Sequence, residues 1–213
     1  MRNLARCHGA LIALSVFGMA SGCGALKEGY QPKQLYAFEL NRPDATAAPA
    51  DKGVVKVRRF RVSSAFQDKQ LVYRTGDVTY ESDFYNEFLT SPDALITEEA
   101  RRWLGASDVF AAALDASSRV RADYALEGNV LGLYGDYRDR ANPRAAVEAQ
   151  FFLIAEAPVA GAIVFRKTYR AFGSVREKGA DGVVSGLNDA LTEILASLEA
   201  DLRDALRKSV TEE

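Results

Sequence analysis

The N-terminal segment, residues 1–22, constrains the mature fold most, because it carries the pattern of a segment that is removed. Residues 1–6 hold two positive charges and no acid, residues 10–20 form an uncharged apolar run, and the small residues 20–22 follow. This order is typical of a secretory signal with a small-residue cleavage site. A transmembrane helix is the alternative, but the apolar run falls well short of the ~20 residues that cross a bilayer. We therefore expect residues 1–22 to be a signal peptide and the fold to form outside the cytoplasm.

Cys23 follows the small residues directly. A cysteine at this place makes the segment resemble a bacterial lipoprotein signal, in which the sulfur receives a diacylglycerol and the cysteine becomes the first mature residue. The resemblance implies that Cys23 is the lipid-attachment site. An ordinary cleaved signal is the alternative, since Ala20 stands where lipoproteins usually have Leu. In Gram-negative lipoproteins an Asp after the cysteine commonly retains the protein at the inner membrane. Gly24 in that position favours a lipid anchor on the periplasmic face of the outer membrane.

Removal of the signal would also remove the side chains that many catalytic and metal sites need. The only histidine, His8, and one of the two cysteines, Cys7, lie inside the signal, and Cys23 would be acylated. The mature chain then has no histidine and no free thiol, which excludes Ser-His-Asp and Cys-His catalysis, thiolate zinc sites and histidine metal sites. Carboxylate pairs and Ser-Lys arrangements stay open, and with them a hydrolase that works without histidine. We expect no catalytic residue, no metal and no cofactor, and hence no enzyme.

The mature composition is that of one acidic globular domain. The chain has 27 basic and 29 acidic residues, and the loss of Arg2 and Arg6 leaves 25 against 29, a net charge of −4. This balance argues against a nucleic-acid partner. A hydrophobic fraction of 48% is enough for a normal core. We expect a lipidated tether over residues 23–33, a single domain over 34–208 and a short tail over 209–213.

Apolar periodicity predicts a run of strands interrupted by one helix and closed by another. Strands are expected at residues 34–40, 54–62, 71–74, 78–81, 121–134, 145–156 and 162–172, and helices at 92–104 and 182–208. The proline-containing segment 41–53 indicates a loop, and residues 109–114 could form a strand or a short helix. The predicted fold class is α+β, with a mainly antiparallel sheet, helices packed on one face and a long C-terminal helix.

The apolar positions also predict which faces are buried. Residues 55 and 57 share one face of a strand whereas 60 and 62 share the other, so a bulge is expected near Arg58 and Arg59. The first helix should begin after Ser91 as N-cap, end at Gly105 as the C′ residue, and bury a stripe of Ile96, Ala100, Trp103 and Leu104. The leucine stripe of the last helix is expected in the core. It could also form an oligomer seam, so a homo-oligomer stays open.

The order of these elements resembles a known family. A lipoprotein cysteine precedes an early strand, a Val-rich strand, an aromatic stretch, a helix with a Trp-Leu pair, a hairpin and a Leu-rich C-terminal helix. The residues that carry the resemblance are Leu35–Phe38, Val57–Val62, Gln70–Arg74, Tyr80–Phe88, Trp103-Leu104 and Tyr124–Gly128. From about Lys33 to Arg207 the chain is similar to the ABC-type transport auxiliary lipoproteins, including the PqiC-type proteins.

This resemblance implies a function without catalysis. The family's lipoproteins accompany MCE-domain proteins and their ABC transporters, which move phospholipids or other hydrophobic solutes between the two membranes. We therefore expect an accessory lipoprotein that is held at the membrane through Cys23, with an MCE-domain protein or another ABC transporter component as partner. The alternative is an envelope assembly or scaffold lipoprotein that takes no part in transport.

Two stretches are candidate contact surfaces. The aromatic stretch contains Tyr80, Phe84, Tyr85 and Phe88, which could contact a partner or lipid, or could instead cover the sheet edge or the core. The basic stretch contains Lys56, Arg58, Arg59 and Arg61, which could bind anionic headgroups or an acidic partner. Its alternative role is a solvated strand face, or an edge that charge protects from pairing.

Overall fold

The structure is a computed structural model that describes residues 31–42, 53–156 and 161–211. The predicted signal peptide, Cys23, most of the predicted tether and residues 43–52 of the predicted loop lie outside the described residues. No helix in the described part of the chain is long and apolar enough to cross a membrane. All elements named below lie in the unit Lys33–Glu213.

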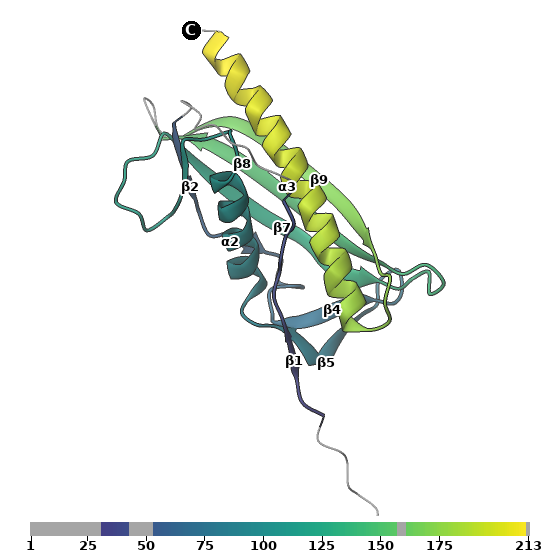
Figure 1. The fold of residues 1–213 in the computed structure, drawn as a ribbon. Helices are drawn as coiled ribbons and strands as arrows, with labels where there is room; N and C mark the ends of the chain where they lie inside the picture. The colour runs from purple at the N-terminus through teal and green to yellow at the C-terminus, as the bar shows by residue number, and fades with distance from the viewer. Residues whose placement is uncertain (1–30, 43–52, 157–160, 212–213) are drawn as a thin grey trace, which may run out of the picture. The chain divides into compact units, whose positions relative to one another are not determined.

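The described residues form nine strands and two helices (Figure 1). The strands are β1 (Gln34–Tyr36), β2 (Val54–Val57), β3 (Arg61–Val62), β4 (Gln70–Arg74), β5 (Tyr80–Phe88), β6 (Ala112–Asp115), β7 (Tyr124–Asp136), β8 (Arg144–Ala155) and β9 (Ala162–Ser174). The helices are α2 (Pro92–Gly105) and α3 (Ala180–Thr211). The segment that could have been a strand or a helix therefore contains the start of β6. An α+β fold with a long C-terminal helix is confirmed.

The sheet is mixed, so the prediction of a mainly antiparallel sheet is wrong. β8 pairs antiparallel with one edge of β7, whereas β2, β3 and β4 all pair parallel with β7. The pairs β1–β5 and β2–β6 are parallel as well. Short turns return the chain antiparallel, which gives β4–β5, β7–β8 and β8–β9. The strands of each parallel pair are far apart in the sequence, and in every such pair except β1–β5 the chain between them includes α2.

The predicted bulge near Arg58 and Arg59 is confirmed by the strand register. Val57 lies opposite Leu126 of β7, and Arg61 lies opposite Asn129. From Val57 to Arg61 the chain advances four residues, whereas their partners on β7 are only three residues apart. One extra residue therefore lies in the segment that joins β2 to β3, which is the pattern of a bulge. The bulge turns the buried ring of Phe60 into the core, where its backbone N–H donates to Thr97 Oγ1 on α2 at 2.9 Å.

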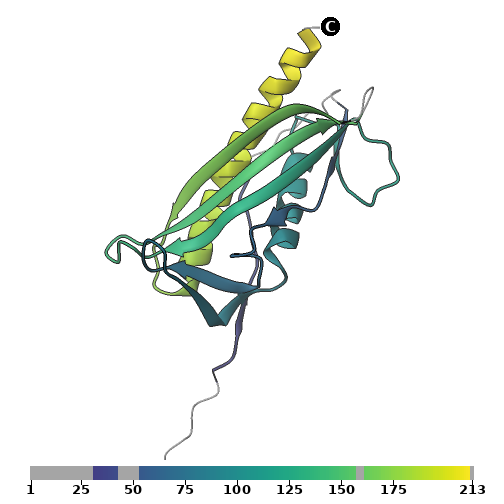
Figure 2. The ribbon, with the colours of Figure 1, turned by 180° about the vertical axis from the view of Figure 1, so that it is seen from behind.

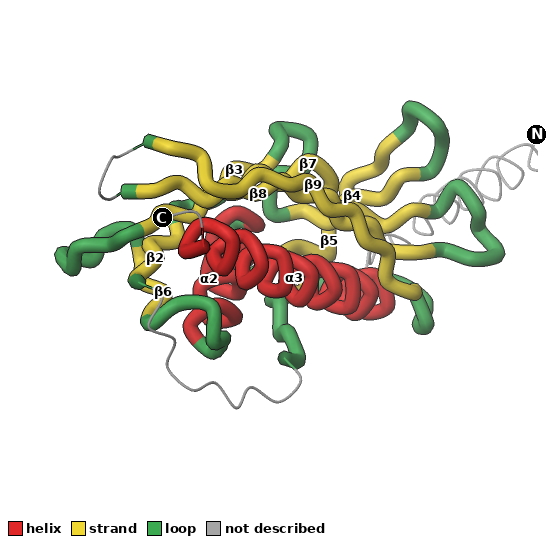
Figure 3. Tube along the Cα trace, turned by 90° about the horizontal axis from the view of Figure 1, so that it is seen from above, coloured by secondary structure: helices red, strands yellow, loops and turns green. Residues whose placement is uncertain are grey.

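Both helices pack on one face of the sheet through the predicted apolar stripes (Figure 3). The α2 residues of the stripe are buried, as are the α3 leucines, so the last helix serves the core of its own chain. α3 approaches β9 closely at Gly173, where an added Cβ would lie 1.9 Å from the carbonyl oxygen of Gly186. Ser91 is the N-cap of α2, but its side chain makes no cap hydrogen bond. α2 extends through Gly105, one residue further than the predicted helix 92–104, and its C-cap is Ala106.

The first strand is shorter than predicted, because residues 37–42 leave the sheet and cross the helical layer. β1 ends at Tyr36, and the ring of Phe38 is then buried with its centroid 5.1 Å from that of Phe88. The backbone N–H of Glu39 donates to Asn188 Oδ1 on α3 at 3.2 Å. We call residues 37–42 the strap. Figure 1 shows it passing between α2 and α3.

A buried carboxylate holds the end of the strap. Glu199 on α3 accepts two hydrogen bonds from Arg42, at 3.0 and 3.1 Å. It also accepts one from Trp103 Nε1 of α2 and one from Arg203, both at 2.8 Å. Arg42 donates further to the carbonyl oxygen of Ala106 at 2.5 Å. We call this group of residues the Glu199 clamp, because it ties the strap and both helices together.

Candidate functional site

The face of the sheet opposite the helices is open and carries a positive charge. In Figure 2 the strands β7, β8 and β9 lie in front of α3, and Figure 3 shows both helices on the other side. The strand register places six basic and four acidic strand side chains on this open face: Lys56, Arg61, Arg74, Arg144, Arg166 and Arg170 against Glu87, Glu127, Asp136 and Glu148. The strand side chains of the open face therefore have a net charge of +2, whereas the whole chain has −2.

A groove of about 480 Å³ lies on the open face beside the bulge. Its lining combines the predicted basic stretch with apolar side chains from β8 and β9: Arg58, Arg59, Arg61, Phe152, Ile154 and Ile163. β7 contributes the rest of the lining, residues 127–129. Because guanidinium groups and apolar side chains share one concave surface, the groove suits an anionic surface that also has apolar contacts to offer.

The structure brings the three predicted arginines together but gives them different partners. Arg58 forms two ion pairs, at 2.5 and 2.6 Å, with glutamates of β7 and of the segment after β8. Arg59 pairs with Asp93 at the start of α2. Burial opposes ionisation of Asp93, but hydrogen bonds from Arg59 and Ser91 outweigh that effect and lower its pKa. Arg61 is exposed and forms no ion pair with any other described residue, so its charge is available to an outside anion.

The other end of the open face is built from arginine and aromatic contacts. The guanidinium carbon of Arg144 lies 3.9 Å from the ring centroid of Phe172, and that of Arg170 lies 5.2 Å from it. Asp136 is buried at this end and accepts hydrogen bonds from the Arg138 guanidinium at 2.7 and 2.9 Å. These bonds outweigh burial and lower the pKa of Asp136 to about 2. The arginines here are already engaged with rings or carboxylates, which leaves fewer free charges than in the groove.

The predicted aromatic stretch forms strand β5, and the structure does not bring its four rings together. Tyr80 packs toward Phe66 and Tyr134, with ring centroids 6.0 and 5.8 Å apart. Phe84 and Tyr85 contact each other at 5.2 Å and stay exposed. Phe88 is 2% exposed and lies in the core against Phe38, so its place as a surface contact is corrected to a packing role. The reason is a bulge in β5 between Ser82 and Glu87, which changes the face on which successive side chains fall.

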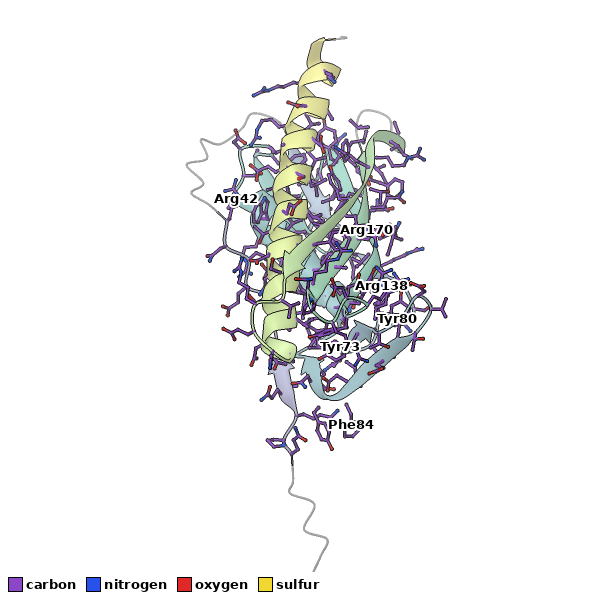
Figure 4. The ribbon with its side chains drawn as sticks, turned by 90° about the vertical axis from the view of Figure 1, so that its right-hand side faces the viewer. Arg42, Tyr73, Tyr80, Phe84, Arg138 and Arg170 are labelled. Atoms are coloured by element: carbon purple, nitrogen blue, oxygen red, sulfur yellow. The ribbon has the colours of Figure 1, made fainter. Side chains whose placement is uncertain are left out.

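A second apolar surface surrounds Phe84, and the sequence pattern did not show it. β1 lies along the outer edge of β5, so that Leu35 faces Glu87 and the N–H of Leu89 donates to the Tyr36 carbonyl at 2.7 Å. We call Lys33, Leu35, Phe84, Tyr85 and Leu89 the β1–β5 edge. Figure 4 shows Phe84 at the end of the fold where β1 lies. Leu35 and Leu89 were missed because parallel pairing between segments that are distant in sequence leaves no local signal.

The β1–β5 edge lies beside the first turn of α3. Burial and the neighbouring carboxylate of Asp181 raise the pKa of Tyr36 to about 12. A cleft of about 540 Å³ lies between β4, β5, the β7–β8 turn and the N-terminal end of α3. In it Tyr73 donates to Asp83 Oδ2 at 2.8 Å, and burial with this bond raises the pKa of the Tyr73 hydroxyl. The pair is a satisfied hydrogen bond rather than an activated nucleophile, because a raised pKa keeps the hydroxyl protonated.

The described residues contain no group of three or more His, Cys, Asp or Glu side chains that could hold a metal ion. Besides the cleft at Tyr73, the structure assembles two surfaces, the open face with its groove and the β1–β5 edge. Both offer charge and apolar area rather than a reactive pair.

Comparison with known proteins gives the family. The family model described as the ABC-type transport auxiliary lipoprotein component matches residues 36–199 of the 213. No curated protein matches the chain.

Solved structures share the fold. The chain is similar to protein XCC0632 from Xanthomonas campestris, with 16% identity, a TM-score of 0.72 and coverage of 84% of this chain and 99% of that one. It is also similar to a crystal structure titled only as an uncharacterized protein, with 17% identity, a TM-score of 0.64 and coverage of 80% and 99%. At these identities the likeness concerns the fold alone.

Proposed function

The chain belongs to the ABC-type transport auxiliary lipoprotein family, and from that premise we propose how it acts. It is a non-catalytic accessory of an ABC/MCE-type system that moves lipids or other hydrophobic solutes in the Gram-negative envelope. A lipid on Cys23 holds it at the periplasmic face of the outer membrane. The folded domain then docks an MCE-domain protein or another transporter component. The family match over most of the chain is the observation that carries this proposal.

The anchor is supported by the signal pattern that ends at Cys23. Two or more acyl chains give stable membrane attachment, which a single chain does not. Cys23→Ala is therefore expected to move the protein from the membrane fraction to the soluble periplasmic fraction. Cys7→Ala is the matched control, because that cysteine is expected to leave with the signal. Mass spectrometry of the wild-type N-terminus should show an acylated Cys23, and membrane retention of Cys23→Ala would contradict the anchor.

The open face supports a docking role. Its net charge of +2 suits an acidic partner surface, and the Arg61 guanidinium lies in the groove with apolar side chains around it. Charges at an interface mainly guide association and select the partner. A positive face in an acidic chain therefore gives the domain a preferred side from which a partner can approach. α3 does not compete for this role, since its apolar stripe is already covered by its own sheet.

Capture from detergent extracts tests the partner. The lipidated protein should retain a transporter component or an MCE-domain protein, and Arg61→Glu should reduce the captured amount several-fold, more strongly at low salt. Lys178→Glu makes the same charge change at an exposed residue in the turn before α3 and should capture normally. Capture of cell-wall or secretion components instead would favour the scaffold alternative. Equal loss with both variants would remove the open face from the interaction.

A further inference from the structure

Exposed apolar side chains concentrate at the β1–β5 edge. The described residues include ten exposed large hydrophobic side chains, and four of them belong to the β1–β5 edge. In the edge itself Phe84 is 67% exposed, Leu35 56%, Leu89 55% and Tyr85 40%. An exposed apolar cluster of this kind marks an interaction surface in a protein that is otherwise well packed.

The chain connection places this edge beside the expected anchor. Only residues 24–34 separate Leu35 from Cys23. Fully extended chain spans at most ~3.3–3.6 Å per residue, so Leu35 is never more than about 40 Å from the cysteine. A flexible segment of that length has an average span of about 20 Å. Among the described strands β1 is the first after the anchor, and β5 pairs with it directly.

The polar groups at this edge also suit a lipid surface. Lys33 Nζ lies 5.1 Å from the ring centroid of Phe84 and 3.0 Å from Glu87 Oε2. Lys69 Nζ donates to the carbonyl oxygen of Leu89 at 3.1 Å. Lysines that border exposed aromatic rings can extend their ammonium groups to phosphates while the rings enter the interfacial layer.

We propose that the β1–β5 edge rests on the bilayer that holds the acylated Cys23, with Phe84, Tyr85, Leu35 and Leu89 in its interfacial region. The inference rests on the proposed lipid anchor and adds an orientation to it. A protein partner is the competing occupant. The bilayer is favoured because a tether of this length keeps the edge within reach of the membrane at all times.

A tryptophan in place of Phe84 tests the contact. The chain has one tryptophan, Trp103, which is buried and hydrogen-bonded, so its emission gives a constant baseline. The lipidated Phe84→Trp protein is reconstituted into phosphatidylethanolamine–phosphatidylglycerol vesicles with and without brominated lipid. Its added emission should shift to shorter wavelength and lose intensity to the bromine. Ile163→Trp is the matched control, because residue 163 is 59% exposed at the groove and should be neither shifted nor quenched.

The outcomes separate the inference from the anchor. Phe84→Trp protein that floats with the vesicles while its added emission stays unshifted and unquenched overturns the inference and leaves the anchor intact. Wild-type protein that carries no acyl group and does not float overturns both. A shift of the added emission that grows with protein concentration in detergent, without vesicles, assigns the edge to a second copy and overturns the membrane contact. Unchanged Trp103 emission in each variant checks that the fold is retained.

Discussion

The Glu199 clamp offers a sharp test of how this fold is held together. Glu199→Ala removes the acceptor of four hydrogen bonds from Arg42, Trp103 and Arg203 in one change. Glu199 is only 8% exposed, so water cannot easily replace its carboxylate. The variant leaves the indole N–H of Trp103 and the Nη2 group of Arg42 without their carboxylate acceptor. Unpaired buried donors are far more costly than an absent hydrogen bond.

The magnitude follows from what each donor retains. Removal of one partner from a buried ion pair costs about 3–5 kcal/mol. The lower end applies here, because Arg42 keeps the Ala106 carbonyl and Arg203 keeps Asp108, whose Oδ1 lies 3.1 Å from its Nε. We expect Glu199→Ala to lower the free energy of unfolding by ~3 kcal/mol. For a domain of this size that corresponds to a fall in Tm of about 6–12 °C.

Urea and thermal unfolding followed by circular dichroism measure this loss. Glu193→Ala is the matched control, since Glu193 is exposed on the same helix and its removal should change stability by no more than ~0.5 kcal/mol. Glu199→Gln should fall between the two, because the amide oxygen keeps one acceptor but not the charge. If Glu199→Ala and Glu193→Ala unfold at the same midpoint, the clamp contributes nothing and the reasoning is wrong.

Two further predictions concern packing and pH. Gly173→Ala should lower the free energy of unfolding by about 2–3 kcal/mol, since a Cβ there would lie 1.9 Å from the Gly186 carbonyl oxygen. Gly105→Ala is the control, because its Cβ would have only an ordinary contact at 3.9 Å. Equal urea midpoints for the two variants would contradict the close approach. The pKa of Asp136 falls from 3.8 to about 2 on folding, so its ionised form stabilises the fold above pH 3.8 and this contribution is lost as the pH falls through about 2. Asp136→Asn should therefore be less stable than wild type near neutral pH, and the difference in Tm should shrink as the pH falls from 3.8 to about 2. A difference in Tm that does not change with pH would refute the stabilising role of ionised Asp136. The same pH dependence in the exposed Asp204→Asn would also refute it.

Local patterns predicted the parts of the fold that depend on neighbours in sequence. The leucine stripe of α3, the β7–β8–β9 hairpins and the bulge beside Phe60 all follow from periodicity within one segment or from a short turn. Parallel pairing of β7 with β2, β3 and β4 was not predictable in this way. Alternation identifies a strand but not the direction of a partner strand that lies far away in the sequence.

The candidate surfaces show the same division. The arginines of the basic stretch lie together because they are close in sequence. Among the described residues only Arg61 of the three lacks an ion-pair partner, since the carboxylates that hold Arg58 and Arg59 come from other elements. The aromatic stretch identified Phe84 as a surface residue, but Phe88 is in the core because β1 and the strap cover it. Charge and apolar content are visible in a sequence, whereas exposure depends on what packs against each side chain.

The clamp also bears on how an anchored domain is held. The proposed tether would enter the fold through β1, which has only three residues paired with β5 and which alone would hold the chain weakly. The strap continues from β1 and fixes that entry by burying Phe38 and by joining Arg42 to Glu199. If the clamp opened, residues 33–42 would be free to add about 35 Å of chain to the tether, and the β1–β5 edge would lose its first strand. A carboxylate on the C-terminal helix therefore sets both the effective length of the proposed anchor and the shape of the surface that would meet the membrane.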